Sequence, residues 1–181
     1  TPPIADKKEK KLIIHDDTRI DNYYWLNERE NPEVISYLAE ENKYTQSILK
    51  STKSFQKKLF NEMKSRIKED DNSVPYFYND YWYVTKYEKG KDYPIYTRKH
   101  MQLDAEEEII LDVNLLAKDY KYFRVSGISI SPDNKKVSYG VDTLSRRIYT
   151  IKIKNLDTDE MYSDNIVGVN SYAAWADDSQ T

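Results

Sequence analysis

The sequence predicts a mostly β chain with N-terminal helices, in which a helical lead-in precedes a partial β-propeller of about two blades. Apolar residues recur at helical spacing before residue 73 and alternate with polar residues in short segments after it. A strand that ends in an acidic turn occurs twice, about 44 residues apart. We therefore expect an N-terminal extended segment and helical pair over residues 1–72, followed by the start of a propeller domain over residues 73–181.

The composition favours a globular chain and excludes several classes of function. Of the 181 residues, 39% are hydrophobic, 33% are charged and 17 are tyrosines, which favour half-buried pleated surfaces. The net charge of −3 is spread over interspersed residues of both signs, so no basic field is available for binding nucleic acid. The sequence has no cysteine, which excludes disulfides, thiolate nucleophiles and cysteine zinc sites.

No segment approaches the roughly 18 apolar residues of a membrane-spanning helix, and the first residues lack the apolar stretch of a signal peptide. We therefore expect no membrane association and a cytoplasmic location. The sequence begins with Thr1 rather than methionine, so residues can have been removed from its front.

Two consecutive helices are predicted before residue 73. Asn31 is a suitable cap, Pro32 suits the first helical position, and the apolar residues that follow predict a helix to about Lys50. A second helix is predicted after Thr52, because apolar side chains step by four along one stripe. The stripe consists of Phe55, Leu59, Met63 and Ile67. Each helix thus has one apolar face, which we interpret as packing surface for another domain rather than as a ligand groove.

The rest of the sequence predicts short strands joined by turns. Residues 76–78 and 81–87, joined by a tight Asn79-Asp80 turn, form a predicted hairpin. Asp112 is expected to cap a short helical turn that ends at Leu116. The other predicted strands are 93–99, 108–112, 123–130, 136–142, 148–156 and 161–165. Two successive meanders result.

The repeated turn is the most informative feature. Ser131-Pro132-Asp133-Asn134 ends one predicted strand, and Ala176-Asp177-Asp178 ends another that begins near Tyr172. A repeat of about 40–45 residues that carries four strands is typical of propeller blades. A propeller closes a ring of typically four to eight blades, whereas 181 residues leave room for about two. We therefore interpret the chain as the N-terminal part of a longer protein.

A search for catalytic chemistry finds no active site. The segment from Gly127 to Ser131 contains Ser129 but lacks the second glycine of the G-x-S-x-G nucleophile turn, and it lies in a predicted strand. His15 and His100 are interpreted as surface residues. The acidic runs 69–71 and 106–108 lack the spacing of a calcium loop. We expect no catalytic residue, metal site or cofactor in this chain.

Arg146 and Arg147 are the candidate site residues. They adjoin each other in a predicted loop between two strands of a blade, where guanidinium groups can pair with a carboxylate in a forked geometry. A solvated turn is an equally acceptable interpretation. Arg147 directly precedes the strand predicted to begin at Ile148, so its direction is more restrained and it is the preferred candidate.

Several strings along nearly the whole chain share a likeness to one known family. They are DTRIDNYYWL at 17–26, PEV at 32–34, YL at 37–38, EN at 41–42, RIK at 66–68, SVPY at 73–76, YPIYTR at 93–98, SPDN at 131–134, DTLSRRIY at 142–149 and WADDS at 175–179. Together they resemble the prolyl oligopeptidase family of serine peptidases. The Ser145-Arg146-Arg147 string brings the resemblance nearer to its oligopeptidase B branch than to its proline-cleaving branch.

The resemblance implies a seven-bladed propeller that caps an α/β-hydrolase domain, with the N-terminal segment wrapping onto the hydrolase. It implies cleavage of short peptides after Lys or Arg, with the propeller gating access to the active site. The catalytic serine, aspartate and histidine would lie beyond Thr181. Arg146 or Arg147 is then expected to contribute to the contact between propeller and hydrolase. The alternatives are a proline-specific peptidase and a non-enzymatic propeller that acts as an interaction module.

Overall fold

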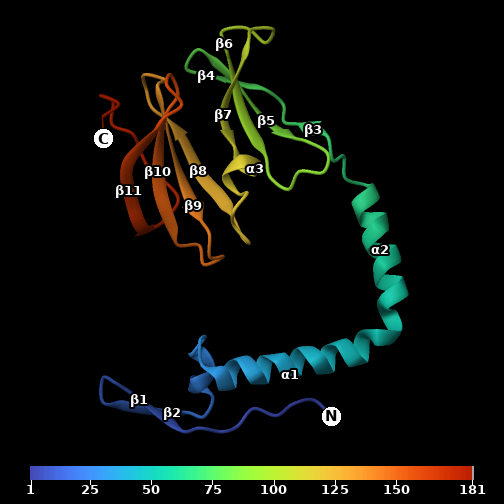
Figure 1. Cartoon of the computed structure of the whole chain (residues 1–181). Coiled ribbons are helices and arrows are strands. Elements are labelled where there is room, and N and C mark those ends of the chain that lie inside the picture. The colour runs from blue at the N-terminus through green and yellow to red at the C-terminus, as the bar shows by residue number, and fades with distance from the viewer. Residues whose placement is uncertain (181) are drawn as a thin grey trace. The chain divides into compact units, whose positions relative to one another are not determined.

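A computed structural model describes residues 1–180 and divides the chain into two compact units, Thr1–Ile67 and Lys68–Thr181. Figure 1 labels the elements of both units. Residues 68–72 group with the second unit, because strand β3 (Asp71–Asn72) pairs with strand β5 (Tyr81–Tyr87).

The N-terminal unit begins with a hairpin where the sequence analysis expected only an extended segment. Strands β1 (Lys10–Ile14) and β2 (Asp17–Asp21) pair antiparallel. The turn residues His15 and Asp16 have φ values of 52° and 62°, the left-handed conformation that a two-residue hairpin turn needs. Histidine and aspartate tolerate this conformation but mark it less clearly than Asn-Gly does. His15 is exposed, as predicted.

Both predicted helices are confirmed. Helix α1 (Pro32–Ile48) begins after Asn31, whose side-chain oxygen accepts a hydrogen bond from the Glu33 backbone N–H at 2.9 Å. Helix α2 (Lys53–Ser65) follows it. A short 3-10 helix precedes each of them: η1 (Tyr24–Asn27) lies before α1, and η2 (Leu49–Thr52) lies between α1 and α2. None of the helices in the described part of the chain is long and apolar enough to cross a membrane.

Few side chains of the N-terminal unit are buried. Its buried apolar residues are Trp25 and Val34, and the Trp25 indole N–H donates to the Asp6 carbonyl at 2.9 Å. The stripe predicted on the second helix, from Phe55 to Ile67, remains exposed. Caps, turns and one small contact cluster therefore hold this unit in shape, rather than a core.

The second unit contains two meanders. The first comprises β3, β4 (Tyr76–Tyr78), β5, β6 (Ile95–His100) and β7 (Glu107–Asp112). β3 and β4 both pair with β5 and occupy one edge position, interrupted by Pro75, which offers no N–H to the ladder. The Asn79-Asp80 turn, with φ values of 46° and 65°, is the predicted hairpin turn.

The second meander follows helix α3 (Val113–Leu116), whose predicted cap is confirmed: the Asp112 carboxylate accepts from the Asn114 backbone N–H at 2.9 Å. The four strands are β8 (Arg124–Ile130), β9 (Lys136–Asp142), β10 (Tyr149–Asn155) and β11 (Met161–Val169), in that order across the sheet. β11 continues past its predicted end at Asn165. Two successive four-position meanders form two blades of a propeller, as predicted.

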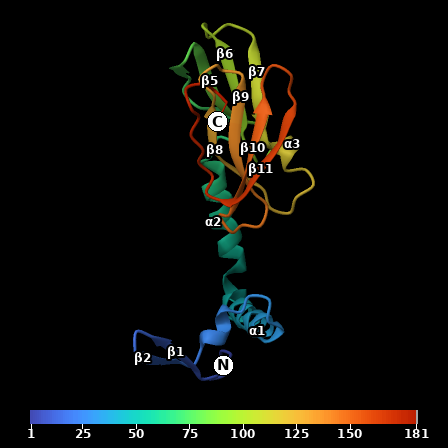
Figure 2. The same cartoon turned by 90° about the vertical axis from the view of Figure 1, so that its left-hand side faces the viewer.

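The hydrophobic core of this unit combines residues of both sheets. Its buried members are Tyr83, Ile110, Leu111, Val113, Ala117, Phe123, Val137, Tyr139 and Val141. Figures 1 and 2 show the two sheets side by side. Each blade thus covers an apolar face of its neighbour.

Hydrogen bonds to the turn between β8 and β9 join the two blades. The Asn79 side chain donates to the Pro132 carbonyl at 2.9 Å. Arg98, only 3% exposed, donates through Nη1 to the Asn134 carbonyl and through Nε to Glu108, both at 2.7 Å. The first copy of the repeated turn is thus a contact point between successive blades.

The second copy of the repeated turn is present, but the strand predicted before it is wrong. Ser179 Oγ in this turn accepts from the Asp133 backbone N–H at 3.1 Å. Residues 170–175 run beside β8 without a strand ladder, and the Trp175 indole donates to a β8 carbonyl at 3.1 Å. The Ser171 backbone lies so close to Gly127 that an added Cβ would sit 1.9 Å from the Ser171 oxygen. The segment therefore packs against the backbone of β8 instead of pairing with it.

Candidate functional site

Arg146 and Arg147 lie in the loop that joins β9 to β10. Both side chains are exposed, and Arg147 has a left-handed φ of 57°. Strand β10 begins at Tyr149, one residue later than predicted, so Arg147 lies two residues before it. The carboxylate of Asp142 adds a restraint on the backbone of Arg147 that the sequence analysis did not foresee.

Asp142 organises this loop from the end of β9. The residue is 1% exposed, and its carboxylate accepts hydrogen bonds from the backbone N–H groups of Leu144 and Arg147, both at 2.8 Å. Burial raises the pKa of this carboxyl, but the N–H groups of residues 144–147 outweigh burial and bring the pKa below its usual value. The carboxylate is therefore ionised at neutral pH and holds the backbone of Arg147 in place.

A hollow of about 610 Å³ opens beside this loop. It is lined by Arg124, Ser126, Arg147, Ile148, Tyr149, Gly168, Val169, Asn170, Ser171 and Tyr172. Arg146 is absent from this lining, so the structure separates the two neighbouring arginines that the sequence analysis considered together. Arg147 is the one that faces a concave surface.

Arg124 is the residue of this hollow that the sequence analysis missed. It lies on β8 directly opposite Asp142 in the ladder with β9. The pairing depends on a register shift between Ser126 and Ser129, which moves every β8 residue before it by one position. Gly127 lies in that shift with a φ of 65°, and a glycine inside a predicted strand is the one signal that could have suggested a bulge.

Two glycines allow the Ser171 segment of this lining to approach β8 and β9 closely. The backbone of Ser171 lies against both Gly127 and Gly140, and a Cβ added at Gly140 would sit 2.8 Å from the Ser171 Cα. Ser171 is buried, and its Oγ lies 3.3 Å from the Ser126 Oγ. The hollow therefore has a fixed floor rather than a loose loop on that side.

The hollow carries two cationic side chains. Within residues 1–180, neither Arg124 nor Arg147 forms an ion pair, since Asp142 accepts from the backbone of Arg147 and not from its guanidinium. Two cationic side chains next to serine and asparagine side chains are suited to hold a carboxylate or another oxyanion by forked hydrogen bonds. Within the described residues, the hollow offers neither a nucleophile paired with a base nor a set of metal ligands.

The other sequence candidates take structural positions. Ser129 lies within β8, as predicted, and its carbonyl accepts the Trp175 indole N–H. His100 ends β6, with its ring 5.0 Å from the Tyr81 ring. No cluster of three or more histidine or acidic side chains suited to a metal ion occurs within the described residues.

Comparisons with known proteins agree on one family. The family model described as "Prolyl oligopeptidase, N-terminal beta-propeller domain" matches residues 2–181. A dipeptidyl aminopeptidase BI from Pseudoxanthomonas mexicana is 37% identical over 199 residues, which cover 100% of this chain and 28% of the relative. Protease 2 from Moraxella lacunata is 34% identical over 177 residues, which cover 95% of this chain and 26% of the relative.

Solved structures give the same result. Oligopeptidase B from Leishmania major aligns with a TM-score of 0.86 and 30% identity, over 97% of this chain and 27% of that protein. Oligopeptidase B from Trypanosoma brucei aligns with a TM-score of 0.83 and 26% identity over the same shares. The chain thus spans little more than a quarter of the length of the proteins it matches.

Proposed function

The chain belongs to the prolyl oligopeptidase family, and from this premise we propose that it is the N-terminal and first propeller part of a serine oligopeptidase that hydrolyses short peptides. The match of the family model over residues 2–181 carries the proposal. Hydrolysis would proceed by acyl transfer through a serine that a histidine activates. The 181 residues themselves contain no G-x-S-x-G turn, so the catalytic groups would belong to an α/β-hydrolase domain elsewhere in the protein.

The coding sequence and a purified full-length protein test this proposal. We expect a G-x-S-x-G string followed by an aspartate and then a histidine, and loss of peptide hydrolysis when that serine is replaced by alanine. The 181-residue chain alone should hydrolyse nothing. A complete protein without such a string would instead be a non-enzymatic propeller that serves as an interaction module.

For specificity, we propose cleavage after Lys or Arg. The Ser145-Arg146-Arg147 string and the 30% identity with oligopeptidase B from Leishmania major support this branch. The relative named dipeptidyl aminopeptidase BI supports a different activity, the removal of dipeptides from the amino end. Three arylamides separate the possibilities: an N-blocked Arg derivative, an N-blocked Gly-Pro derivative and a dipeptide with a free amino end. Fastest release from the first is expected, and preference for either of the others would replace this assignment.

We further propose that the propeller limits access to the active site and that Arg147, together with Arg124, contacts a carboxylate of the hydrolase domain. The support is local: both arginines line one hollow with a fixed floor, and no described carboxylate pairs with them. A partly exposed contact of this kind contributes about 0–1 kcal/mol and weakens with salt. It would therefore bias opening and closing without determining the fold.

Kinetics of the full-length protein across ionic strength test this contact. Arg147→Ala should change kcat/KM by up to about fivefold at low salt and flatten its salt dependence, because about 1 kcal/mol corresponds to that factor. Arg146→Ala is the matched control, since Arg146 does not line the hollow. Equal behaviour of both variants and the unaltered protein at every salt concentration would leave the loop as an ordinary solvated turn.

The cytoplasmic location stays a prediction.

A further inference from the structure

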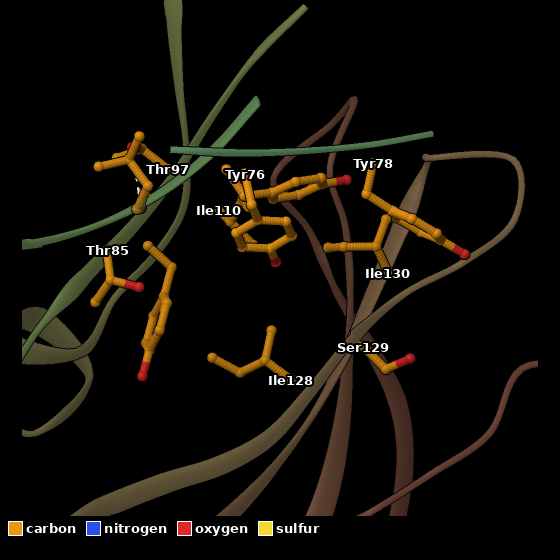
Figure 3. Close-up of a pocket in the computed structure, with 11 residues that line it drawn as sticks. Tyr76, Tyr78, Thr85, Thr97, Ile110, Ile128, Ser129 and Ile130 are labelled. Atoms are coloured by element: carbon orange, nitrogen blue, oxygen red, sulfur yellow. Dashed lines mark hydrogen bonds between the residues drawn. The ribbon is translucent and has the colours of Figure 1, made fainter. Parts of the chain in front are cut away.

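A second hollow, of about 320 Å³, is lined by residues of both blades. It is lined by Tyr76, Tyr78, Tyr83, Val84, Thr85, Tyr96, Thr97, Ile110, Ile128, Ser129 and Ile130. Figure 3 shows Tyr76, Tyr78 and Ile130 on one side of this space and Ile128 on the other. We call it the interblade pocket. No residue of the arginine hollow belongs to it.

The lining of the interblade pocket is neutral. Four tyrosines and three isoleucines supply most of it, with hydroxyls from threonine and serine, and no lining residue is charged. A lysine or arginine side chain would lose its hydration there without gaining a counter-charge. A neutral ring fits better, because the rings of Tyr76 and Tyr83 are already stacked in the wall, with centroids 5.2 Å apart and planes at 19°.

Tyr83 contributes its ring to this wall. Tyr83 is 5% exposed, and its hydroxyl is buried beside the Arg98 guanidinium. Burial raises the pKa of this phenol, against the smaller effect of the neighbouring Arg98 guanidinium, so the hydroxyl stays protonated at neutral pH. A ligand in the pocket would therefore meet the faces and edges of the tyrosine rings, which favour a ring-to-ring contact with an aromatic side chain.

A free strand edge runs beside the pocket. β4 pairs with β5 on one side, and within the described residues no strand pairs with its other side. Two of its three residues, Tyr76 and Tyr78, are also pocket lining. An extended peptide can add to such an edge by main-chain hydrogen bonds and present every second side chain to the same face.

We propose that the interblade pocket binds the tyrosine or tryptophan side chain of an extended peptide that lies along β4. The proposal depends on the proposed function in one respect: a peptidase takes peptides as its substrates, and this makes a peptide the expected ligand of the pocket. The peptide would thus contact the propeller through a neutral aromatic residue. This residue is distinct from the residues on either side of the bond that is cleaved.

Equilibrium binding to the full-length protein tests the pocket without requiring turnover. The probe is acetyl-Gly-Gly-Trp-Gly-Gly-amide, compared with the same peptide carrying alanine in place of tryptophan, by isothermal titration calorimetry. The tryptophan peptide should bind at least about tenfold more tightly. Tyr76→Ala should abolish most of that difference. Phe77→Ala should preserve it, because Phe77 is the exposed neighbour on β4 that lies outside the pocket lining.

A second pair of variants fills the pocket instead of opening it. Ile128→Phe should remove the preference for tryptophan, whereas Ile166→Phe, on the outer strand β11 and exposed, should leave it unchanged. Equal binding of the two peptides, or a preference that survives both Tyr76→Ala and Ile128→Phe, overturns the proposal. A full-length protein that prefers the tryptophan peptide but hydrolyses no peptide would instead contradict the proposed peptidase function. The pocket assignment would then still stand.

Discussion

The N-terminal unit and the two-blade unit differ in where their apolar side chains lie. The N-terminal unit buries Trp25 and Val34, whereas the blades share a continuous core drawn from both sheets. The N-terminal unit also exposes large apolar side chains on its hairpin and on α2, among them Ile13 and Phe55. Local signals are thus enough to form its elements, but they bury little. The N-terminal unit therefore leaves its apolar faces uncovered within the described residues, while the blades cover each other.

The two units also differ in whether they bury charged side chains. The ion pairs of the N-terminal unit, Lys8 with Glu33 and Arg66 with Glu62, are formed by exposed side chains. In the blades, Arg98 and Asp142 are almost fully buried and hydrogen-bonded. Buried charges of this kind fix the positions of turns, whereas exposed pairs contribute little to stability.

The largest expected effect comes from the same substitution made in both units. Phe123, 6% exposed, belongs to the blade core, and Phe55, 63% exposed, lies on α2. In the 181-residue chain, Phe123→Ala should lower the free energy of unfolding by about 3–5 kcal/mol, because it removes a buried ring and leaves a cavity. Phe55→Ala should change it by less than about 0.5 kcal/mol. Urea unfolding followed by circular dichroism measures both.

The full-length protein sharpens this comparison. If another domain covers α2, Phe55→Ala should become clearly destabilising there while Phe123→Ala keeps its effect. An equally large loss from both variants in the short chain would contradict the contrast between the two units.

An intermediate effect is expected from removing one buried and one exposed arginine. Arg98→Met takes away the donors to Asn134 and Glu108 and should cost about 1–3 kcal/mol, since the Asn134 carbonyl loses its partner. Arg66→Met breaks an exposed pair with Glu62 four residues earlier on the helix and should stay within about 0.5 kcal/mol. Unfolding midpoints at low and high salt check this, because only the Arg66 effect should fade with salt. Similar losses at both positions would show that burial does not matter here.

The fold was predictable from the sequence where local chemistry decides it. The Asn31 and Asp112 caps and the Asn79-Asp80 turn each act within a few residues, and all were predicted at their observed positions. The hairpin at His15-Asp16 was missed, because its turn residues tolerate left-handed φ without strongly signalling it. The strand predicted to begin near Tyr172 was wrong, because contacts of that segment with β8, far away in the sequence, decide its path.

The candidate site was predictable only in part, for the same reason. Arg147 could be selected from its place in a loop. Its restraint could not be predicted, because it depends on the path of the turn, which directs the backbone N–H groups of Leu144 and Arg147 at the Asp142 carboxylate. Arg124 joins the site through the register shift at Gly127, which changes its partner on β9. Strand spacing alone cannot reveal such a shift. The interblade pocket likewise requires the packing of two sheets.

The smallest expected effect concerns pH and the loop that carries Arg147. The pKa of the Asp142 carboxyl is lowered in the folded chain, since burial, which raises it, is outweighed by the four backbone N–H groups. A carboxyl whose pKa is lower in the folded than in the unfolded chain stabilises the fold at pH values above its unfolded pKa of about 3.9. That contribution is lost as the pH falls through the folded-state pKa. The stabilisation by Asp142 is therefore present at neutral pH and disappears in acid.

Asp142→Asn should consequently lower the urea midpoint of the chain slightly at pH 7. The gap to the unaltered chain should narrow as the pH falls below about 3.9, where the Asp142 carboxyl of the unfolded chain takes up a proton while that of the folded chain resists protonation. Asparagine keeps one oxygen acceptor, so amide hydrogen exchange should speed up mainly in residues 144–147 rather than throughout β9 and β10. Asp16→Asn, in the exposed turn of the N-terminal hairpin, is the matched control and should change neither measurement. A gap that stays constant from pH 7 to pH 3 would mean that shape, and not the charge of Asp142, holds the loop, and the contrast between buried and exposed charge would then rest on Arg98 alone.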